Sequence, residues 1–280
     1  MIVMKFGGSS VSNAEKIRQV IEIVRGRLPR KPLVIVSALR GVTDDLFKLG
    51  EQAVRGSSPP VEPVRKRHLE AIRELGLDPV LVEPLLGELE ALLKGISLVK
   101  ELSPRSLDYI VSFGERLSSR VIAAAFVKAG VAAEQHDAFD IGLLTTEEHG
   151  AAQPLPEADG EIKRIVSKMA KVPIVTGYIG KTKGGSITTL GRNGSDYSAT
   201  IFGAAIDADE IEIWSDVDGI MTADPRLAPT AKPIDALTFA EASELAYYGG
   251  KVLHPATITP AMRKGITVRC LITFKPDNNC

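Results

Sequence analysis

The first eleven residues constrain the fold of this chain more than any other stretch. A short apolar strand with one cation inside it, Lys5, runs directly into Gly7-Gly8-Ser9-Ser10. A helical pattern then opens at Ser12 or Asn13. A strand that ends in glycines before a helix directs backbone N–H groups and a helix N-terminus at one point, which favours an anion. On these residues alone, a tight turn beside a lysine that extends to solvent stays open as the alternative.

Length and charge exclude several classes of protein. The chain has 280 residues, a formal net charge of -1 and 5% aromatic residues. The length suits two domains or one large α/β domain. A balanced charge and few aromatics do not favour a nucleic-acid or membrane partner. The four histidines and two cysteines lack zinc spacing, and no signal peptide or apolar membrane span is visible, so we expect a cytoplasmic protein without a resident metal.

The order of elements predicts an α/β fold. Helical spacing over residues 17–24 is followed by the apolar run Leu33–Val36, which is typical of a buried parallel strand and ends in a small-residue loop. Strand, helix, strand with polar groups at the strand end is the doubly wound pattern. Residues 46–103 predict only helices. The basic cluster Arg65–Arg67 within them favours a solvated helix face over a partner site.

The densest polar stretch, Thr188–Tyr197, precedes a helix predicted over Ser198–Ala205. It places Arg192 between two glycines and sets Ser195 and Asp196 before the helix. A helix cap would need only one such residue, and the additional arginine favours a ligand site.

Three glycine-containing loops carry Lys5, Arg192 and Lys251. They concentrate positive charge without an overall basic surface, as phosphoryl transfer requires. Arg192 with Glu115 is also suited to a zwitterion, because a guanidinium binds a carboxylate and a carboxylate binds an ammonium group.

Six ordered motifs carry a resemblance to a known family. Lys5–Val11 looks like the N-terminal signature of aspartokinases, within the wider amino acid kinase family. Five further segments look like that family's other motifs, and they follow one another in the same order as in the family. They are Ser37–Thr43, Ser112–Glu115, Leu190–Tyr197, Trp214–Arg226 and Lys251–Pro255. Leu190–Tyr197 particularly resembles the kinase portion of bifunctional aspartokinase–homoserine dehydrogenases.

The resemblance implies a three-layer αβα sandwich around a mostly parallel sheet of about eight strands. It implies a single domain over residues 1–280, with an amino-acid-binding part over 1–200, a nucleotide-binding part over 201–280 and no ACT regulatory domain. The implied reaction is ATP-dependent phosphorylation of the aspartate β-carboxylate, with Mg²⁺ carried by the ATP. A homodimer and a separate regulatory chain both stay open.

The family's functional residues transfer onto matching positions. Lys5 would neutralise the ATP phosphates, and Asp196 would organise the reacting groups and Mg²⁺. Aspartate would be bound by Thr43, Glu115, Arg192 and Ser195. The nucleotide would be bound by Lys5, Phe6, Gly7, Gly8, Ser9, Ser215, Asp216, Met221, Arg226, Lys251 and Val252. Met221 stands where the family usually has a tyrosine, which weakens that one contact.

Two alternatives remain. A kinase of another small acid would share the fold, although Glu115 and Arg192 favour a free α-amino acid. Aspartate and glutamate differ by one methylene, a distance that sequence cannot measure. A non-catalytic subunit that kept the fold would be indicated by loss of Lys5 or Asp196, and both residues are present.

Overall fold

The computed structural model describes residues 1–57, 59–216, 219, 221, 222, 228, 230–232, 234–247 and 255–274. Its strands are β1 (Ile2–Phe6), β2 (Pro32–Val36), β3 (Ala133–His136), β4 (Val172–Thr176), β5 (Ile179–Lys181), β6 (Ile187–Thr189), β7 (Glu210–Ser215) and β8 (Val268–Ile272). Its α-helices are α1 (Ala14–Arg27), α2 (Val42–Val54), α3 (Glu62–Leu75), α4 (Glu83–Val99), α5 (Pro104–Lys128), α6 (Ala158–Val166), α7 (Gly194–Ala205), α8 (Phe239–Tyr247) and α9 (Pro255–Lys264). Short 3₁₀ helices span Leu28–Arg30, Pro79–Leu81 and Ala138–Ile141.

The central sheet has six parallel strands in the order β3-β4-β2-β1-β7-β8. The expectation of about eight strands in one sheet is too high for the described residues. β5 and β6 pair antiparallel with each other, because a tight turn folds residues 179–189 into a separate hairpin. The chain moves from β1 to β2 on one side and later places β7 on the other. The carboxyl end of β1 therefore lies where strand order reverses, the usual ligand position in such sheets.

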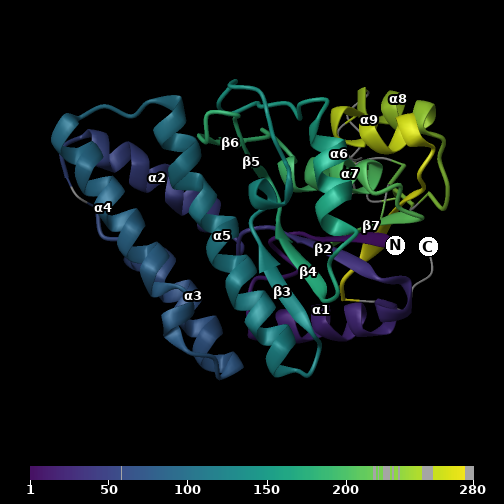
Figure 1. Cartoon of the computed structure of the whole chain (residues 1–280), viewed down its shortest axis with the longest axis horizontal. Helices are drawn as coiled ribbons and strands as arrows, with labels where there is room; N and C mark the ends of the chain where they lie inside the picture. Colours follow the sequence, from purple (N-terminus) through teal and green to yellow (C-terminus); the bar gives the residue numbers. More distant parts are fainter. Residues whose placement is uncertain are drawn as a thin grey trace.

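Helices cover both faces of the sheet, so the expected three-layer sandwich is confirmed (Figure 1). Met4 and Phe6 of β1 join the core formed with α1 to α5. Val3 joins the second core, formed with α6, α7 and α9. Because side chains alternate along a strand, Lys5 shares the face of Val3 and is directed toward α7.

Helix α5 begins at Pro104, eight residues before the Ser112–Glu115 motif. Ser103 caps it by accepting a hydrogen bond from the Ser106 N–H at 3.1 Å, and Pro104 takes the first helical position. The segment Ser112–Glu115 therefore lies inside a helix of 25 residues rather than at its start. This placement fixes Glu115 on a rigid, buried helix face.

Helix α7 begins at Gly194, four residues before the predicted start. Asn193 takes the cap position in a left-handed conformation (φ 55°) and makes no side-chain cap bond. Neither Ser195 nor Asp196 is the cap, since both lie in the first turn. Their side chains are available for another purpose, close to the positive end of the helix dipole.

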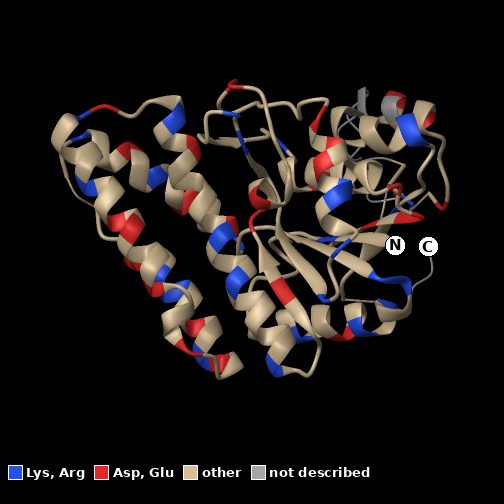
Figure 2. Ribbon diagram, viewed as in Figure 1, with Lys and Arg blue, Asp and Glu red and all other residues tan. Residues whose placement is uncertain are grey.

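Charged residues of both signs are interspersed along the ribbon (Figure 2). In the basic cluster, Arg65 pairs with Glu83 and Glu90, while Arg67 pairs with Asp45 at 3.2 Å. These pairs favour the interpretation of the cluster as a solvated helix face. In the described part of the chain, no helix is both long enough and apolar enough to span a bilayer.

A buried carboxylate ties α1 to the central strand β7. Glu212 is fully buried; it accepts hydrogen bonds from Arg27 Nε at 3.0 Å and from Trp214 Nε1 at 2.9 Å. The Trp214 ring in turn stacks on Phe6, with centroids 5.9 Å apart. This network holds the end of β7 against the end of β1.

We expect Glu212→Ala to lower the free energy of unfolding by about 3 kcal/mol or more, because it leaves Arg27 and the indole N–H without their buried partner. Urea denaturation followed by tryptophan fluorescence measures the change. Glu161→Ala, which removes only an exposed pair with Arg164, should leave the midpoint nearly unchanged. Equal midpoints for both variants would contradict a stabilising role of the network.

Candidate active site

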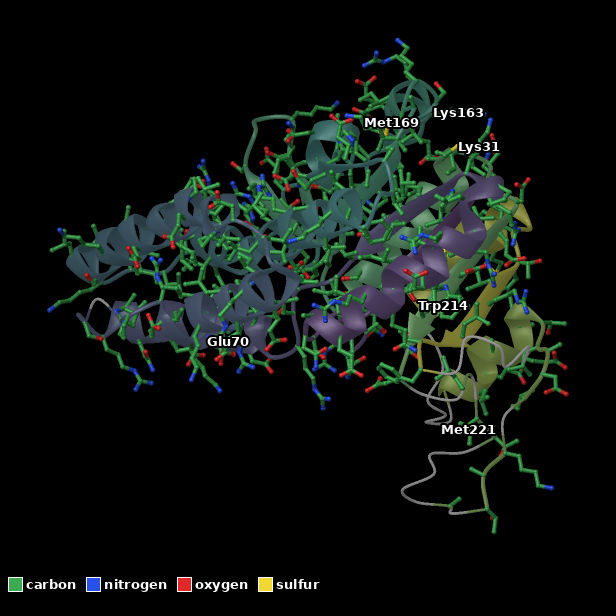
Figure 3. All side chains as sticks on the ribbon, turned by 90° about the horizontal axis from the view of Figure 1, so that it is seen from below. Lys31, Glu70, Lys163, Met169, Trp214 and Met221 are labelled. Carbon is green, nitrogen blue, oxygen red and sulfur yellow. The ribbon has the colours of Figure 1, made fainter. Side chains whose placement is uncertain are left out.

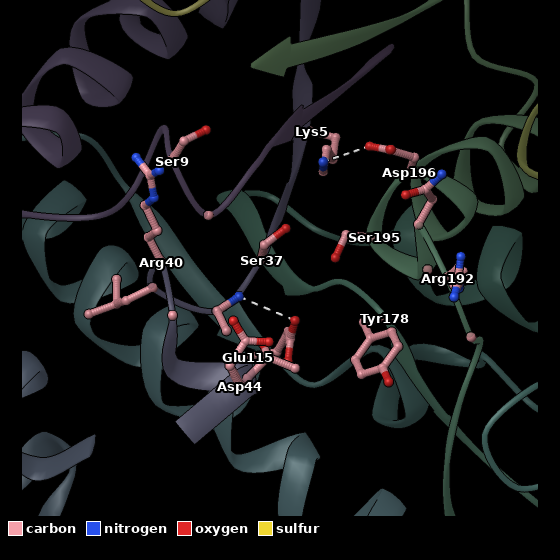
Figure 4. Close-up of a pocket in the computed structure, with 18 of the residues that line it drawn as sticks. Lys5, Ser9, Ser37, Arg40, Asp44, Glu115, Tyr178, Arg192, Ser195 and Asp196 are labelled. Atoms are coloured by element: carbon pink, nitrogen blue, oxygen red, sulfur yellow. Dashed lines mark hydrogen bonds and ion pairs between the residues drawn. The ribbon is translucent and has the colours of Figure 1, made fainter. Parts of the chain in front are cut away.

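A cavity of about 690 Å³ opens at the carboxyl ends of β1, β2 and β4 and at the start of α7. This size is within the usual range for a small-molecule site. Figure 4 shows polar side chains from the separate loops directed into it. It is lined by Lys5, Gly8, Ser9, Ser37, Ala38, Leu39, Arg40, Gly41, Thr43, Asp44, Phe47, Glu115, Gly150, Tyr178, Gly191, Arg192, Asn193, Gly194, Ser195, Asp196 and Asp216.

The structure brings together residues predicted from five separate segments. Those that line the cavity are Lys5, Gly8, Ser9, Thr43, Glu115, Arg192, Ser195, Asp196 and Asp216. Those that do not line it are Phe6, Gly7, Ser215 and Met221. Met221 lies outside the sheet and is well separated from Trp214 (Figure 3). The predicted nucleotide contacts Arg226, Lys251 and Val252 lie outside the described residues.

Phe6 and Gly7 are used inside the fold instead of in the cavity. The Phe6 side chain is fully buried against Trp214. The Gly7 N–H donates to the Trp214 carbonyl at 3.2 Å, and its carbonyl accepts from the Ser10 N–H at 2.9 Å. Both residues therefore shape the turn after β1. The Phe6 side chain and the Gly7 N–H and carbonyl groups are already engaged by other parts of the chain.

Gly8 and Ser9 offer the backbone donors that the sequence predicted. Within the described part of the chain, neither N–H group has a hydrogen-bond acceptor. A Cβ at Gly8 would lie 2.8 Å from the Ala38 carbonyl oxygen, so only glycine permits this close approach of the two loops. Unpaired N–H groups lining a cavity are suited to phosphate oxygens.

Lys5 and Asp196 form an ion pair in the lining of the cavity. Lys5 Nζ lies 2.6 Å from Asp196 Oδ1, and their side chains are 10% and 16% exposed (Figure 4). β1 supplies the lysine and the first turn of α7 supplies the aspartate. The pair places one positive and one negative group at the same wall, near the free N–H groups of Gly8 and Ser9.

Glu115 is buried, and only one of its two carboxylate oxygens accepts a hydrogen bond from the described residues. Its Oε1 accepts from the Ala38 N–H at 3.2 Å, while Oε2 has no hydrogen-bond partner among the described residues. Burial raises the pKa of Glu115 to about 8, against the smaller opposing effects of the Ala38 N–H and the Lys5 charge. A buried oxygen without a partner, facing a cavity, indicates a ligand that brings a donor.

Arg192 is exposed at the rim of the cavity, and no carboxylate among the described residues pairs with it. Figure 4 shows it on the same side as Asp196 and Tyr178 and away from Arg40 and Ser9. An unpaired guanidinium at a cavity is suited to a carboxylate or a phosphate. With Glu115, it offers one group for each charge of a zwitterion.

Among the polar side chains in the cavity that were not assigned a role from the sequence are Arg40, Asp44 and Tyr178. Tyr178 adopts a left-handed conformation (φ 67°), and burial raises its pKa to about 12, so its hydroxyl keeps its proton. All three follow the ends of β2 or β4. The rule that ligands bind beyond the carboxyl ends of parallel strands could have found them.

The described residues contain no cluster of three or more groups that could hold a metal ion. Asp196 pairs with Lys5 of the expected phosphate site, and both Asp196 and Asp216 line the cavity. Mg²⁺ is commonly held by one or two carboxylates together with substrate phosphates. The donor set therefore fits a metal ion that arrives with a nucleotide.

Comparison with known proteins agrees with this geometry. The profile of the amino acid kinase family matches residues 1–271. The chain belongs to this family. The crystal structure of Escherichia coli aspartokinase III in complex with aspartate and ADP (R-state) superposes with a TM-score of 0.88 at 32% identity. The match covers 99% of this amino acid kinase chain and 62% of that one.

The relatives are longer than this chain. Aspartokinase 1 of Arabidopsis thaliana is 42% identical over 98% of this chain, which spans 50% of that protein. Bifunctional aspartokinase/homoserine dehydrogenase 2 of Arabidopsis thaliana is 32% identical over 95% of this chain, and 30% of that protein is covered. Identity over the whole chain is thus higher with aspartokinase 1 than with this bifunctional enzyme. The chain spans about half the length of the first of these relatives.

Proposed function

We propose that this chain phosphorylates the β-carboxylate of L-aspartate with ATP and Mg²⁺. The proposal rests on one observation: the same cavity contains two groups that lack a partner of their own. These are the buried Oε2 of Glu115 and the guanidinium of Arg192. Glu115 would bind the substrate ammonium and Arg192 its α-carboxylate. Thr43 and Ser195 line the same cavity and would supply further hydrogen bonds.

The side chain of a bound aspartate would then face the Lys5–Asp196 pair. A β-carboxylate oxygen attacks the γ-phosphorus, and the bond from that phosphorus to the β,γ-bridging oxygen breaks, giving 4-phospho-L-aspartate and ADP. The nucleophile is already an anion, so no general base is required. Lys5 and the N–H groups of Gly8 and Ser9 would stabilise the charge on the phosphoryl oxygens. Mg²⁺, when bound, would neutralise phosphate charge beside Asp196 and Asp216.

The two substrates would occupy different parts of the chain. The acid would lie among residues supplied by 1–200, because Thr43, Glu115 and Arg192 all belong there. The nucleotide would extend toward residues 201–280, where Asp216 follows β7. We therefore propose that residues 1–200 mainly bind the amino acid and that residues 201–280 mainly bind the nucleotide.

A hydroxylamine-trapping assay tests the substrate directly. With ATP and Mg²⁺, we expect a hydroxamate and stoichiometric ADP from aspartate, and background levels from glutamate and N-acetylglutamate. A hydroxamate from one of the other acids alone would favour a different amino acid kinase. Absence of product with every acid, together with no calorimetric binding of aspartate, would favour a non-catalytic protein.

The raised pKa of Glu115 predicts how aspartate binding depends on pH. At neutral pH the free carboxyl group mostly holds a proton, and binding of the ammonium group requires its release. The KM for aspartate should therefore fall by up to about tenfold per pH unit as the pH rises toward 8. Steady-state rates at several pH values with saturating ATP measure this slope.

The control for this prediction is Glu115→Gln. This variant should show a high aspartate KM that no longer varies in the same pH window. The wild-type protein without substrate should lose stability as the pH rises from 4.5 through about 8, because the native state holds a proton that the unfolded chain has released. A wild-type aspartate KM that is independent of pH would contradict the assignment of Glu115 to the ammonium group.

A further inference from the structure

Asp108 of α5 is a buried carboxylate with no place in the proposed chemistry. It is 3% exposed, and it is the acceptor of four hydrogen bonds from two other segments. Its Oδ2 accepts from His149 Nδ1 at 2.8 Å and from the N–H groups of Gly150 and Thr189, each at 3.1 Å. Its Oδ1 accepts from the Thr189 hydroxyl at 2.7 Å. One side chain thus joins the 149–150 turn to the last residue of β6.

β6 ends three residues before Arg192, and the 149–150 turn is packed beside the intervening backbone. The Ala152 N–H donates to the Thr189 carbonyl at 2.9 Å, which adds a further link between them. Gly191 adopts a left-handed conformation (φ 78°), and a Cβ there would lie 3.1 Å from the Gly150 carbonyl oxygen. The backbone that carries Arg192 is therefore packed on the same turn that Asp108 holds.

The Arg192 side chain depends on this backbone for its position. No acidic side chain in the described ranges forms an ion pair with its guanidinium. Whatever fixes residues 189–191 therefore also fixes the point from which Arg192 reaches the cavity. A displacement of about 1 Å in such a group can cost on the order of 100-fold in rate.

We infer that Asp108 is a positioning residue that holds the 149–150 turn and β6 together and so orients Arg192 toward the α-carboxylate of the substrate. The inference rests on the proposed function for the identity of that substrate. Three donors converge on one oxygen, and bonds to an ionised acceptor are stronger than neutral ones. Removal of the carboxylate leaves buried N–H groups unpaired, which favours rearrangement of the loop.

The test compares Asp108→Ala with Asp137→Ala. Asp137 is also buried (5% exposed) and accepts from Arg120 and Gln135, but it does not line the cavity. Both variants lose a buried, hydrogen-bonded carboxylate and should lose stability. Only Asp108→Ala should raise the aspartate KM, by about tenfold to 100-fold, with the ATP KM changed less than about twofold. Thr189→Val, which removes the hydroxyl that donates to Asp108 but leaves the other three bonds to Asp108 in place, should raise the aspartate KM by a smaller factor and is used if Asp108→Ala does not fold.

Hydrogen exchange separates this inference from the proposed function. Amides of residues 148–152 and 189–194 should exchange faster in Asp108→Ala than in Asp137→Ala. If the wild-type protein phosphorylates no acid, the proposed function fails, while that exchange pattern still supports the anchoring role. Two results would overturn the positioning role of Asp108. One is unchanged exchange at these residues in Asp108→Ala, and the other is a rise of the ATP KM that equals the rise of the aspartate KM in both Asp108→Ala and Thr189→Val.

Discussion

Replacing Lys5 with methionine is expected to lower kcat by about 10²–10³-fold and to change the aspartate KM little. Lys5 lies on β1 just before the free N–H groups of Gly8 and Ser9, where negative charge develops on the transferring phosphoryl group. Arg192 and Glu115, which would hold the aspartate, are left in place. Steady-state kinetics with each substrate varied in turn measure kcat and both KM values, and so separate an effect on kcat from an effect on aspartate binding.

The ion pair with Asp196 requires a second variant. Lys5→Met leaves the Asp196 carboxylate without its partner at 2.6 Å, and this alone could disturb the site. Lys5→Met combined with Asp196→Asn removes both charges, and it should regain stability without regaining kcat. Lys163→Met, which removes an exposed pair on α6, serves as the control for a lost lysine. A kcat for Lys5→Met within about threefold of wild type would contradict a role at the phosphates.

Local rules predicted the parts of the site that follow strands. The alternation in β1 places Lys5 on the face of α7, and the glycines after it form the expected turn. The apolar run at residues 33–36 predicts β2, and Thr43, in the first turn of α2, follows the loop after that strand. Because carboxyl ends of parallel strands meet at one edge, these segments meet as the doubly wound pattern requires.

Contacts between distant segments could not be predicted in the same way. Asp108 and Thr189 are 81 residues apart, and nothing in the helical spacing of residues 104–128 distinguishes Asp108 from an exposed residue. The start of α5 is an exception, because Ser103 followed by Pro104 is a local cap signal that predicts a helix beginning there. The β5–β6 hairpin is not predicted, because strands of three residues carry too little periodicity to be recognised from the sequence.

The roles of individual nucleotide contacts depended most on the resemblance and least on physical reasoning. Phe6 belongs to the family signature, yet an aromatic residue on a buried strand is more simply explained by packing, and the structure places it against Trp214. Arg40 shows the converse case, because its segment was recognised as a motif while the arginine itself received no role. A motif locates a loop, and only the fold shows which of its side chains enter the cavity.

Arg192→Lys is expected to raise the aspartate KM by about tenfold to 100-fold, the usual value of hydrogen bonds to a charged group, and to leave the ATP KM nearly unchanged. Lysine keeps the charge but lacks the planar fork that binds a carboxylate through two parallel hydrogen bonds. Arg164→Lys on α6, whose arginine pairs with Glu161 outside the cavity, is the matched control.

Arg40→Lys distinguishes the two cavity arginines, which lie on opposite sides of the site (Figure 4). A rise of the aspartate KM in Arg40→Lys with none in Arg192→Lys would exchange their roles. A rise of the ATP KM in Arg192→Lys would instead place Arg192 at the phosphates, and the zwitterion clamp would then lack its carboxylate-binding half.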